Sequence, residues 1–464
     1  MKLINTSSNK NTENSPISLE VSATQFSNLP DKPEKKQAII GLDFGTAFTK
    51  AVVASNIMHH AVKWSVAKEN PYLLAGVFYT DHNGICSLKK ISEEETSNLK
   101  MKLLTGELND NDKVNICIFL ALVLQEIRFF VLKSQQDIYQ NCYIDWNLNV
   151  GLPTDGVHNQ DLLNVYKDLV FKAWVLSTKS EISRKSYKNI QEIDTSIDDI
   201  YFKDKINILP EFLAKITGYV NSNRRRDGLH LLIDVGAGTV DITTFNVHKD
   251  AEGQLIPIFD KKVEQLGTNY LLKRRLKGEN VPENSELSPF KNVPFFIRMC
   301  ELLKISEQTL RTRDEPFQGE LVKSINGILK YTKDRRYPNS PVWKSDLPLF
   351  FCGGGAKCDF YKELLEKIDL FSQCHFKVQK IPKPDDFIAE NVTDYDFDRL
   401  SVAYGLSFEA LDAAKILKSN EVEDKLNDEQ NKIKCSCKGT NEFCLKCYGK
   451  GFYKPKLESF SVNN

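Results

Sequence analysis

Residues 38–54 have the sequence AIIGLDFGTAFTKAVVA, which contains two apolar segments separated by a short glycine turn. Ala38–Asp43 has the composition of a buried strand, Phe44–Thr46 that of a tight turn, and Phe48–Ala54 that of a returning strand. This stretch therefore predicts a β-hairpin that places an acid, Asp43, at its tip.

The same pattern recurs in the middle of the chain, at residues 229–247. Leu229–Val235 is a second apolar strand, Gly236–Thr239 a second glycine turn, and Val240–Val247 a returning strand. Asp234 stands near the turn, as Asp43 does in the first copy. An approximate internal repeat of this kind predicts an α/β fold with two similar lobes around a ligand-binding cleft.

A third glycine turn, FFCGGG at residues 350–355, follows an apolar strand and precedes a segment with helical apolar spacing. The remaining boundaries follow from changes in composition. We expect a disordered leader at residues 1–36 and two lobes at residues 37–222 and 223–412, the second of which ends in a helix that returns to the first lobe. A charged linker helix at residues 413–432 and a small cysteine-rich unit at residues 433–455 would follow.

The composition is that of an ordinary folded protein. Among 464 residues, Lys+Arg and Asp+Glu both number 62, and 41% of the residues are hydrophobic. A net charge of zero argues against a nucleic-acid partner. The uninterrupted apolar runs are shorter than the roughly 20 residues of a membrane span, and the N-terminus lacks the apolar core of a secretory signal. With the odd number of cysteines, 11, this predicts a cytoplasmic location and no membrane partner.

Glycine turns of this kind suit phosphate binding, because backbone N–H groups converge where no side chain blocks their approach. Asp43 and Asp234 stand where carboxylates would face a magnesium ion in the cleft, and Asp241 is a third candidate. Glu211, Asp234 and Thr239 are candidates for orienting an attacking water molecule. Each turn alone is more often structural, but three in this order favour a nucleotide site.

The motifs resemble those of the superfamily of actin, sugar kinases and seventy-kilodalton heat-shock chaperone ATPases. Residues 40–46, 233–241 and 351–356 are similar to its phosphate-1, phosphate-2 and adenosine motifs, and residues 209–214 and 401–406 to its two connecting segments. The resemblance covers roughly residues 37–412 and implies duplicated actin-like, ribonuclease-H-like lobes. It is closest to the chaperones, although the chain ends too soon after Leu411 for their peptide-binding domain.

The resemblance implies a set of site residues. The catalytic and magnesium-organising acids would be Asp43, Asp234, Asp241 and Glu211, with magnesium held through the first two. ATP would be bound by the following residues of the three glycine turns, the phosphate-reading lysine and the nucleoside site: Gly45, Thr46, Lys50, Gly236, Gly238, Thr239, Gly267, Glu301, Lys304, Gly353, Gly354, Gly355 and Lys357. The catalytic lysine of the chaperones would correspond to Lys100 or Lys102.

The C-terminal cysteines have the spacing of a zinc site. Cys435 and Cys437 form a first pair, and Cys444 and Cys447 a second, each followed by glycine. Four thiolates from two short knuckles are what tetrahedral Zn²⁺ takes, and the second pair resembles one repeat of the zinc domain of J-domain co-chaperones. A redox pair or free surface thiols are the alternatives.

These features predict an ATPase that uses ATP, Mg²⁺ and Zn²⁺. Our first expectation is a chaperone-like switch that couples nucleotide state to a protein partner, which docks on the zinc tail or on a lobe surface. A filament-forming cytoskeletal or plasmid-segregation ATPase is the alternative, favoured by Lys50, and a small-molecule kinase is the third. The sequence leaves self-association open.

Overall fold

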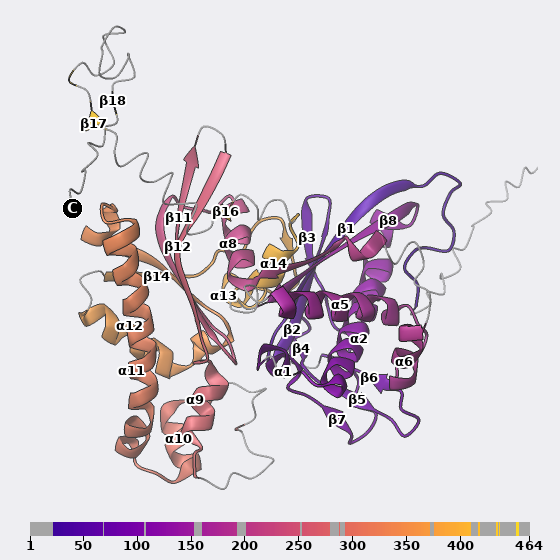
Figure 1. Cartoon of the computed structure of the whole chain (residues 1–464), viewed down its shortest axis with the longest axis horizontal. Coiled ribbons are helices and arrows are strands. Elements are labelled where there is room, and N and C mark those ends of the chain that lie inside the picture. Colours follow the sequence, from indigo (N-terminus) through magenta and orange to yellow (C-terminus); the bar gives the residue numbers. More distant parts are fainter. Residues whose placement is uncertain are drawn as a thin grey trace, which may run out of the picture.

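A computed structural model of the chain describes residues 22–67, 69–105, 108–152, 160–192, 201–250, 253–278, 287, 293–371, 375–409, 416–417, 433–434, 436 and 452–453. Within these ranges the chain forms two mixed β-sheets that lie side by side, each with helices packed against it (Figure 1). The α/β class predicted from the sequence is therefore confirmed.

The first sheet has the strand order β15-β3-β2-β1-β8-β9, with β4 paired to β2. Its strands are β1 (Glu34–Phe44), β2 (Phe48–Ser55), β3 (Met58–Ala61), β4 (Leu74–Ala75), β8 (Cys142–Leu152), β9 (Ile206–Pro210) and β15 (Phe387–Ile388). The predicted first hairpin is present, because β1 pairs with β2 in antiparallel register, Asp43 opposite Lys50. Strand β8 then pairs with β1 in parallel.

Helices α2 (Asp110–Ser134) and α5 (Gln160–Ser177) pack on each other beside this sheet. Helix α2 is long and apolar enough to cross a bilayer, yet 72% of its most apolar window is buried inside the molecule. A core helix of a folded domain shows the same properties, so the length and composition of α2 are weak evidence for a span. The smaller elements nearby are α1 (Leu99–Thr105), α3 (Gln136–Tyr139), α6 (Arg184–Glu192), β5 (Phe78–Thr80), β6 (Cys86–Ser87) and β7 (Glu95–Thr96).

The second sheet has the order β14-β13-β10-β11-β12-β16. Its strands are β10 (Gly228–Val235), β11 (Val240–Asp250), β12 (Gly253–Glu264), β13 (Asp346–Cys352), β14 (His375–Gln379) and β16 (Ile416–Leu417). The second predicted hairpin is present as β10 and β11, with Asp234 opposite Asp241. Three antiparallel strands followed by two parallel ones, β12-β11-β10-β13-β14, repeat the order β3-β2-β1-β8-β9 of the first sheet.

The long helix α11 (Glu307–Tyr331) and α12 (Asp359–Phe371) bury their apolar faces in the core of the second sheet. The third glycine turn leads from β13 through a short 3₁₀ helix, η3 (Gly354–Lys357), into α12, as its sequence predicted. The other helical elements here are α9 (Thr268–Arg275), α10 (Phe296–Leu303), η1 (Thr332–Arg336) and η2 (Pro341–Lys344).

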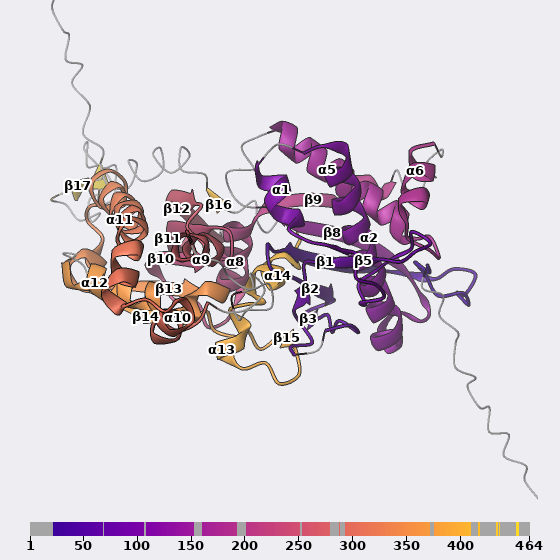
Figure 2. The same ribbon diagram turned by 90° about the horizontal axis from the view of Figure 1, so that it is seen from below.

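Two helices lie between the sheets: α8 (Glu211–Asn221) and α14 (Ser401–Leu406), with α13 (Asp394–Phe397) close by (Figures 1 and 2). They pack on each other, and a separate apolar cluster joins them to both sheets. Glycine makes this contact close: a Cβ at Gly405 would overlap the carbonyl oxygen of Ala214, and one at Gly218 would lie 2.9 Å from the ring of Tyr404. The helices therefore fix how the two hairpin turns face each other.

The structure differs from the expected boundaries at both ends. The predicted leader of residues 1–36 overlaps the folded part, since Phe26 is buried in the first core and the side-chain amide of Gln25 bonds to the backbone of Ile144 in both directions. This happens because β8 offers backbone groups for the chain to satisfy. In the predicted linker helix, Ile416 and Leu417 instead form the short strand β16 on the edge of the second sheet. The short strands β17 (Ile433–Lys434) and β18 (Phe452–Tyr453) pair with each other farther on.

Buried histidines should make the stability of this fold depend on pH. His230 is fully buried between the rings of Phe245 and Phe350, and burial lowers its pKa to about 4. The unfolded chain, whose histidine pKa is near 6.5, binds more protons below that pH, so the free energy of unfolding falls on acidification. From pH 7 to pH 5 we expect His230 to cost about 2 kcal/mol.

The measurement is chemical denaturation at several pH values. In His230→Phe, which keeps a stacked ring, the loss of stability between pH 7 and pH 5 should shrink by about that amount, whereas the exposed His82→Gln should leave it unchanged. An unaltered pH dependence in His230→Phe would show that this histidine does not titrate as its burial implies.

Candidate functional site

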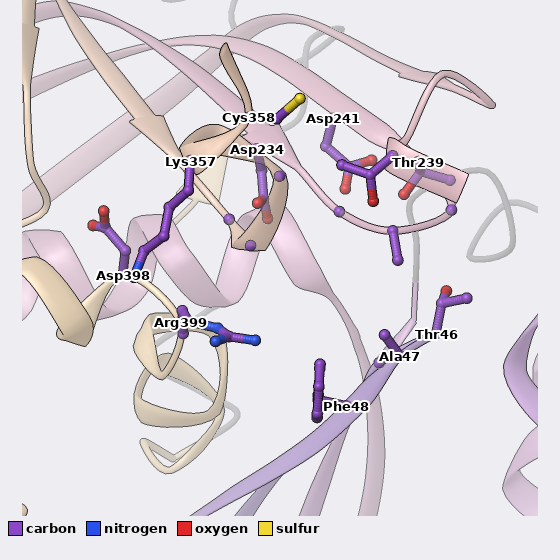
Figure 3. A pocket seen from close by; sticks show the side chains of 18 of the residues that line it. Thr46, Ala47, Phe48, Asp234, Thr239, Asp241, Lys357, Cys358, Asp398 and Arg399 are labelled. Carbon is purple, nitrogen blue, oxygen red and sulfur yellow. The ribbon is translucent and has the colours of Figure 1, made fainter. Parts of the chain in front are cut away.

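A cavity of about 470 Å³ opens where the two hairpin turns face each other (Figure 3). Its walls come from the turn between β1 and β2, the turn between β10 and β11, the third glycine turn, α1, α8 and residues 398–402. The predicted site residues that line it are Asp43, Gly45, Thr46, Lys50, Glu211, Asp234, Gly236, Gly238, Thr239, Asp241, Gly353, Gly354, Gly355 and Lys357. Residues from distant parts of the sequence are thus brought together as expected.

The two turns approach each other closely. A Cβ at Gly238 would lie 3.1 Å from the hydroxyl oxygen of Thr46, which belongs to the opposite hairpin. The carbonyl oxygens of Gly236 and Ala237 accept bonds from the N–H groups of Thr268 and Asn269 at the start of α9, at 3.1 and 2.8 Å. These bonds hold the second turn against α9 and fix its orientation.

Backbone donors of both turns remain available for a ligand. Within the described part of the chain, the N–H groups of Thr46, Ala47, Ala237 and Gly238 have no hydrogen-bond acceptor. All four residues line the same cavity. Unpaired backbone donors on two sides of one cavity are suited to binding a chain of phosphate oxygens.

Three acids at the base of the cavity are each paired with a lysine. Lys50 Nζ lies 2.7 Å from Asp43 Oδ2, and Lys215 Nζ lies 2.5 Å from Asp234 Oδ2. The third pair joins Lys100 to Glu211. The paired ammonium groups offset the charges of the carboxylates, so that a further anion is not repelled.

Burial and charge act in opposite directions on these lysines. Burial alone would lower the pKa of Lys100 and of Lys215, but the adjacent Glu211 and Asp234, respectively, outweigh it and raise both values. Both lysines therefore keep their positive charge at neutral pH.

Asp241 is the acid without such a partner. It is buried, and its Oδ1 has no hydrogen-bond partner among the described residues. Burial, together with the charges of Asp234 and Glu211, raises the pKa of Asp241 well above its usual range. An unsatisfied carboxylate oxygen at this depth indicates that a water molecule or a cation belongs beside it.

The unpaired oxygen of Asp241 is compatible with a bound magnesium ion. Mg²⁺ keeps several waters and takes one or two carboxylates together with phosphate oxygens, and Asp241 Oδ1 is open for such a contact. The predicted ligands Asp43 and Asp234 lie in the cavity but each holds an ammonium group. Among the described residues no three acidic, histidine or cysteine side chains come close enough to form a metal site by themselves.

The mouth of the cavity carries further cations. Lys357, Lys362 and Arg399 line it, and the guanidinium of Arg399 lies 5.2 Å from the ring centre of Phe48 (Figure 3). Sequence reasoning missed Lys215, Lys362 and Arg399, because no motif marks them. For Lys215 a signal existed: it lies one helical turn after Glu211, on the same face of α8.

Three predicted nucleoside-site residues do not line the cavity. Glu301 pairs with Arg298 on the surface, at 2.9 Å, and Lys304 ends α10 in a left-handed conformation with φ of 53°. Gly267 lies behind the second turn, where its N–H donates to the carbonyl oxygen of Gly238. Contact of these residues with a nucleoside stays a prediction.

The structure also distinguishes the two candidate lysines of α1. Lys100 is buried and faces the cavity, whereas Lys102 pairs with Asp112 outside it. The four cysteines of the predicted zinc site, Cys435, Cys437, Cys444 and Cys447, lie outside the described residues.

No protein-family model matches this chain, and no curated protein matches it. Among solved structures, the apo form of the psk41 ParM protein aligns with 84% of this chain and 99% of its own, at 14% identity and a TM-score of 0.37. A MamK double helical filament aligns with 80% of this chain and 98% of its own, at 15% identity and a TM-score of 0.39. Similarities this distant assign neither a family nor an activity.

Proposed function

We propose that this protein binds ATP with Mg²⁺ in the cavity between its two sheets and hydrolyses it slowly. The observation that carries the proposal is that residues of both hairpin turns with unpaired backbone N–H groups line one cavity, together with several lysines. ATP is the polyphosphate that the resemblance of the three glycine turns implies for such a site. The repeated strand order supports reading the two halves as two actin-like units.

We assign separate roles to the residues that line the cavity. The N–H groups of residues 46–47 and 237–238 would bind the phosphate oxygens, and Lys50 and Lys100 would offset their charge. When bound, magnesium would neutralise the phosphates, with Asp241 as its open protein contact. Glu211 and Asp241, which line the same cavity, would orient a water molecule toward the outermost phosphate.

Several biological roles are compatible with ATP binding. A closer likeness to the heat-shock chaperones, and a zinc tail that docks a protein partner in the cytoplasm, find no support in the described residues or in the comparisons. A filament-forming ATPase is the alternative that we place first for testing, since one of the similar solved structures is itself a double helical filament.

The test combines binding and assembly in one preparation. We expect a fluorescent ATP analogue to bind the full chain in Mg²⁺ and to be displaced by ATP. Gly238→Val should abolish this binding, because the added side chain would fill the gap between Gly238 and Thr46, whereas Gly319→Val on the exposed face of α11 should not. Sedimentation with and without Mg-ATP then distinguishes filaments, which pellet, from a monomeric switch. If the analogue does not bind, the proposed function is wrong.

A further inference from the structure

The buried ammonium group of Lys215 is not explained by ATP hydrolysis alone. Lys215 lies on α8 and is 2% exposed. Its Nζ contacts Asp234 Oδ2 at 2.5 Å and the sulfur of Cys352 at 3.2 Å. Taking an ammonium out of water is costly unless a charge compensates it, so this position demands a strong partner.

Asp234 is that partner. The thiol of Cys352 stays neutral, because burial raises its pKa. Asp398, which also lines the cavity, is bound by Lys380 at 3.0 Å. The positive charge of Lys215 is therefore matched chiefly by the carboxylate of Asp234.

One oxygen of Asp234 is occupied by the protein, because Lys215 contacts Oδ2. Its other oxygen, Oδ1, faces the third glycine turn, where a side chain on Gly353 would cover it. A metal ion that bound Oδ2 directly would have to displace Lys215. Lys215 thus occupies the place at Asp234 that a divalent cation would otherwise take.

We propose that Lys215 is a built-in cation that replaces direct magnesium contact at Asp234, so that nucleoside polyphosphates bind this site almost as well without Mg²⁺ as with it. The inference rests on the proposed ATP site and specifies how that site balances charge. Lys50 neutralises Asp43, and Lys100 neutralises Glu211, in the same way. Asp241 has no lysine partner, and its Oδ1 remains open to a hydrated ion.

The experiment measures the dissociation constant of ATP for the full chain in excess Mg²⁺ and in EDTA. For the wild type we expect the two values to agree within about threefold. In Lys215→Met, which keeps the length of the side chain but removes its charge, Asp234 is released to repel phosphate or to bind Mg²⁺. Affinity in EDTA should then fall about tenfold below affinity in Mg²⁺.

Lys102→Met is the matched control, because it removes an ammonium group from an acid pair outside the cavity and should retain the wild-type ratio. Lys215→Arg keeps the charge and should also retain it. A melting curve for each variant shows whether it is folded, and the wild-type measurement decides the matter if Lys215→Met does not fold.

The possible failures are distinguishable. Wild-type binding that weakens more than about threefold in EDTA overturns the role of Lys215 but leaves the ATP site standing. A Lys215→Met variant with no greater magnesium dependence than the wild type does the same. Absence of ATP binding in both conditions overturns the proposed function itself.

Discussion

Gly405→Ala is expected to destabilise the protein by about 3 kcal/mol and to lower its melting temperature by roughly 3 °C. Gly405 lies where α14 crosses α8, and a methyl group there would overlap the carbonyl oxygen of Ala214. The clash is with backbone rather than with a flexible side chain, so the two helices must move apart. Since they lie between the sheets, the apolar cluster around them would open as well.

The matched control is Gly319→Ala in α11, where a Cβ would meet nothing within 4 Å. There the same substitution should stabilise the helix by up to about 1 kcal/mol, because alanine has the better helix propensity. Thermal and urea unfolding of both variants provide the comparison. Equal stabilities for Gly405→Ala and the wild type would show that the helices do not pack as closely as described.

Asp234→Asn is expected to lower ATP turnover by about 100-fold or more while leaving nucleotide binding largely intact. The amide keeps the shape of the side chain but removes the charge that holds Lys215 beside the phosphate site. The ammonium group of Lys215, no longer neutralised, should attract phosphate at least as strongly as before. Binding and chemistry would thereby be separated in one variant.

The measurement is phosphate release under saturating Mg-ATP, with the ATP dissociation constant determined in parallel. Asp346→Asn, at the exposed start of β13, removes an equal charge from the same sheet and should change neither quantity. Hydrolysis at the wild-type rate by Asp234→Asn would show that turnover does not depend on the Asp234–Lys215 pair. If Asp234→Asn instead weakens ATP binding and lowers the melting temperature together, the Asp234–Lys215 pair has a structural role.

Local patterns were enough to predict the elements that carry the site. The hairpins around Asp43 and Asp234 and the glycine turn after β13 were predicted from short-range alternation of apolar residues and from glycine positions. Their convergence on one cavity followed from the internal repeat, and the structure shows it.

Other features were beyond reach of the sequence, because they depend on neighbours that are distant along the chain. Nothing local shows that Lys100 rather than Lys102 turns inward, or that Glu301 pairs with Arg298 at the surface. The inclusion of Phe26 in the first core likewise depends on the backbone of Ile144, in the half of β8 that β9 does not pair with.

The sequence by itself determined the two hairpins, their glycine turns and the acids that stand beside them, since strand alternation and turn geometry are properties of a few consecutive residues. Only the tertiary structure decided how the charges are paired. Lys215 and Asp234 belong to a helix and a strand whose relative position is fixed by an apolar cluster that includes Ile216 of α8 and Leu232 of β10. Ion pairs at the base of a cavity arise from such packing, because a difference of a few ångströms decides which carboxylate an ammonium group reaches.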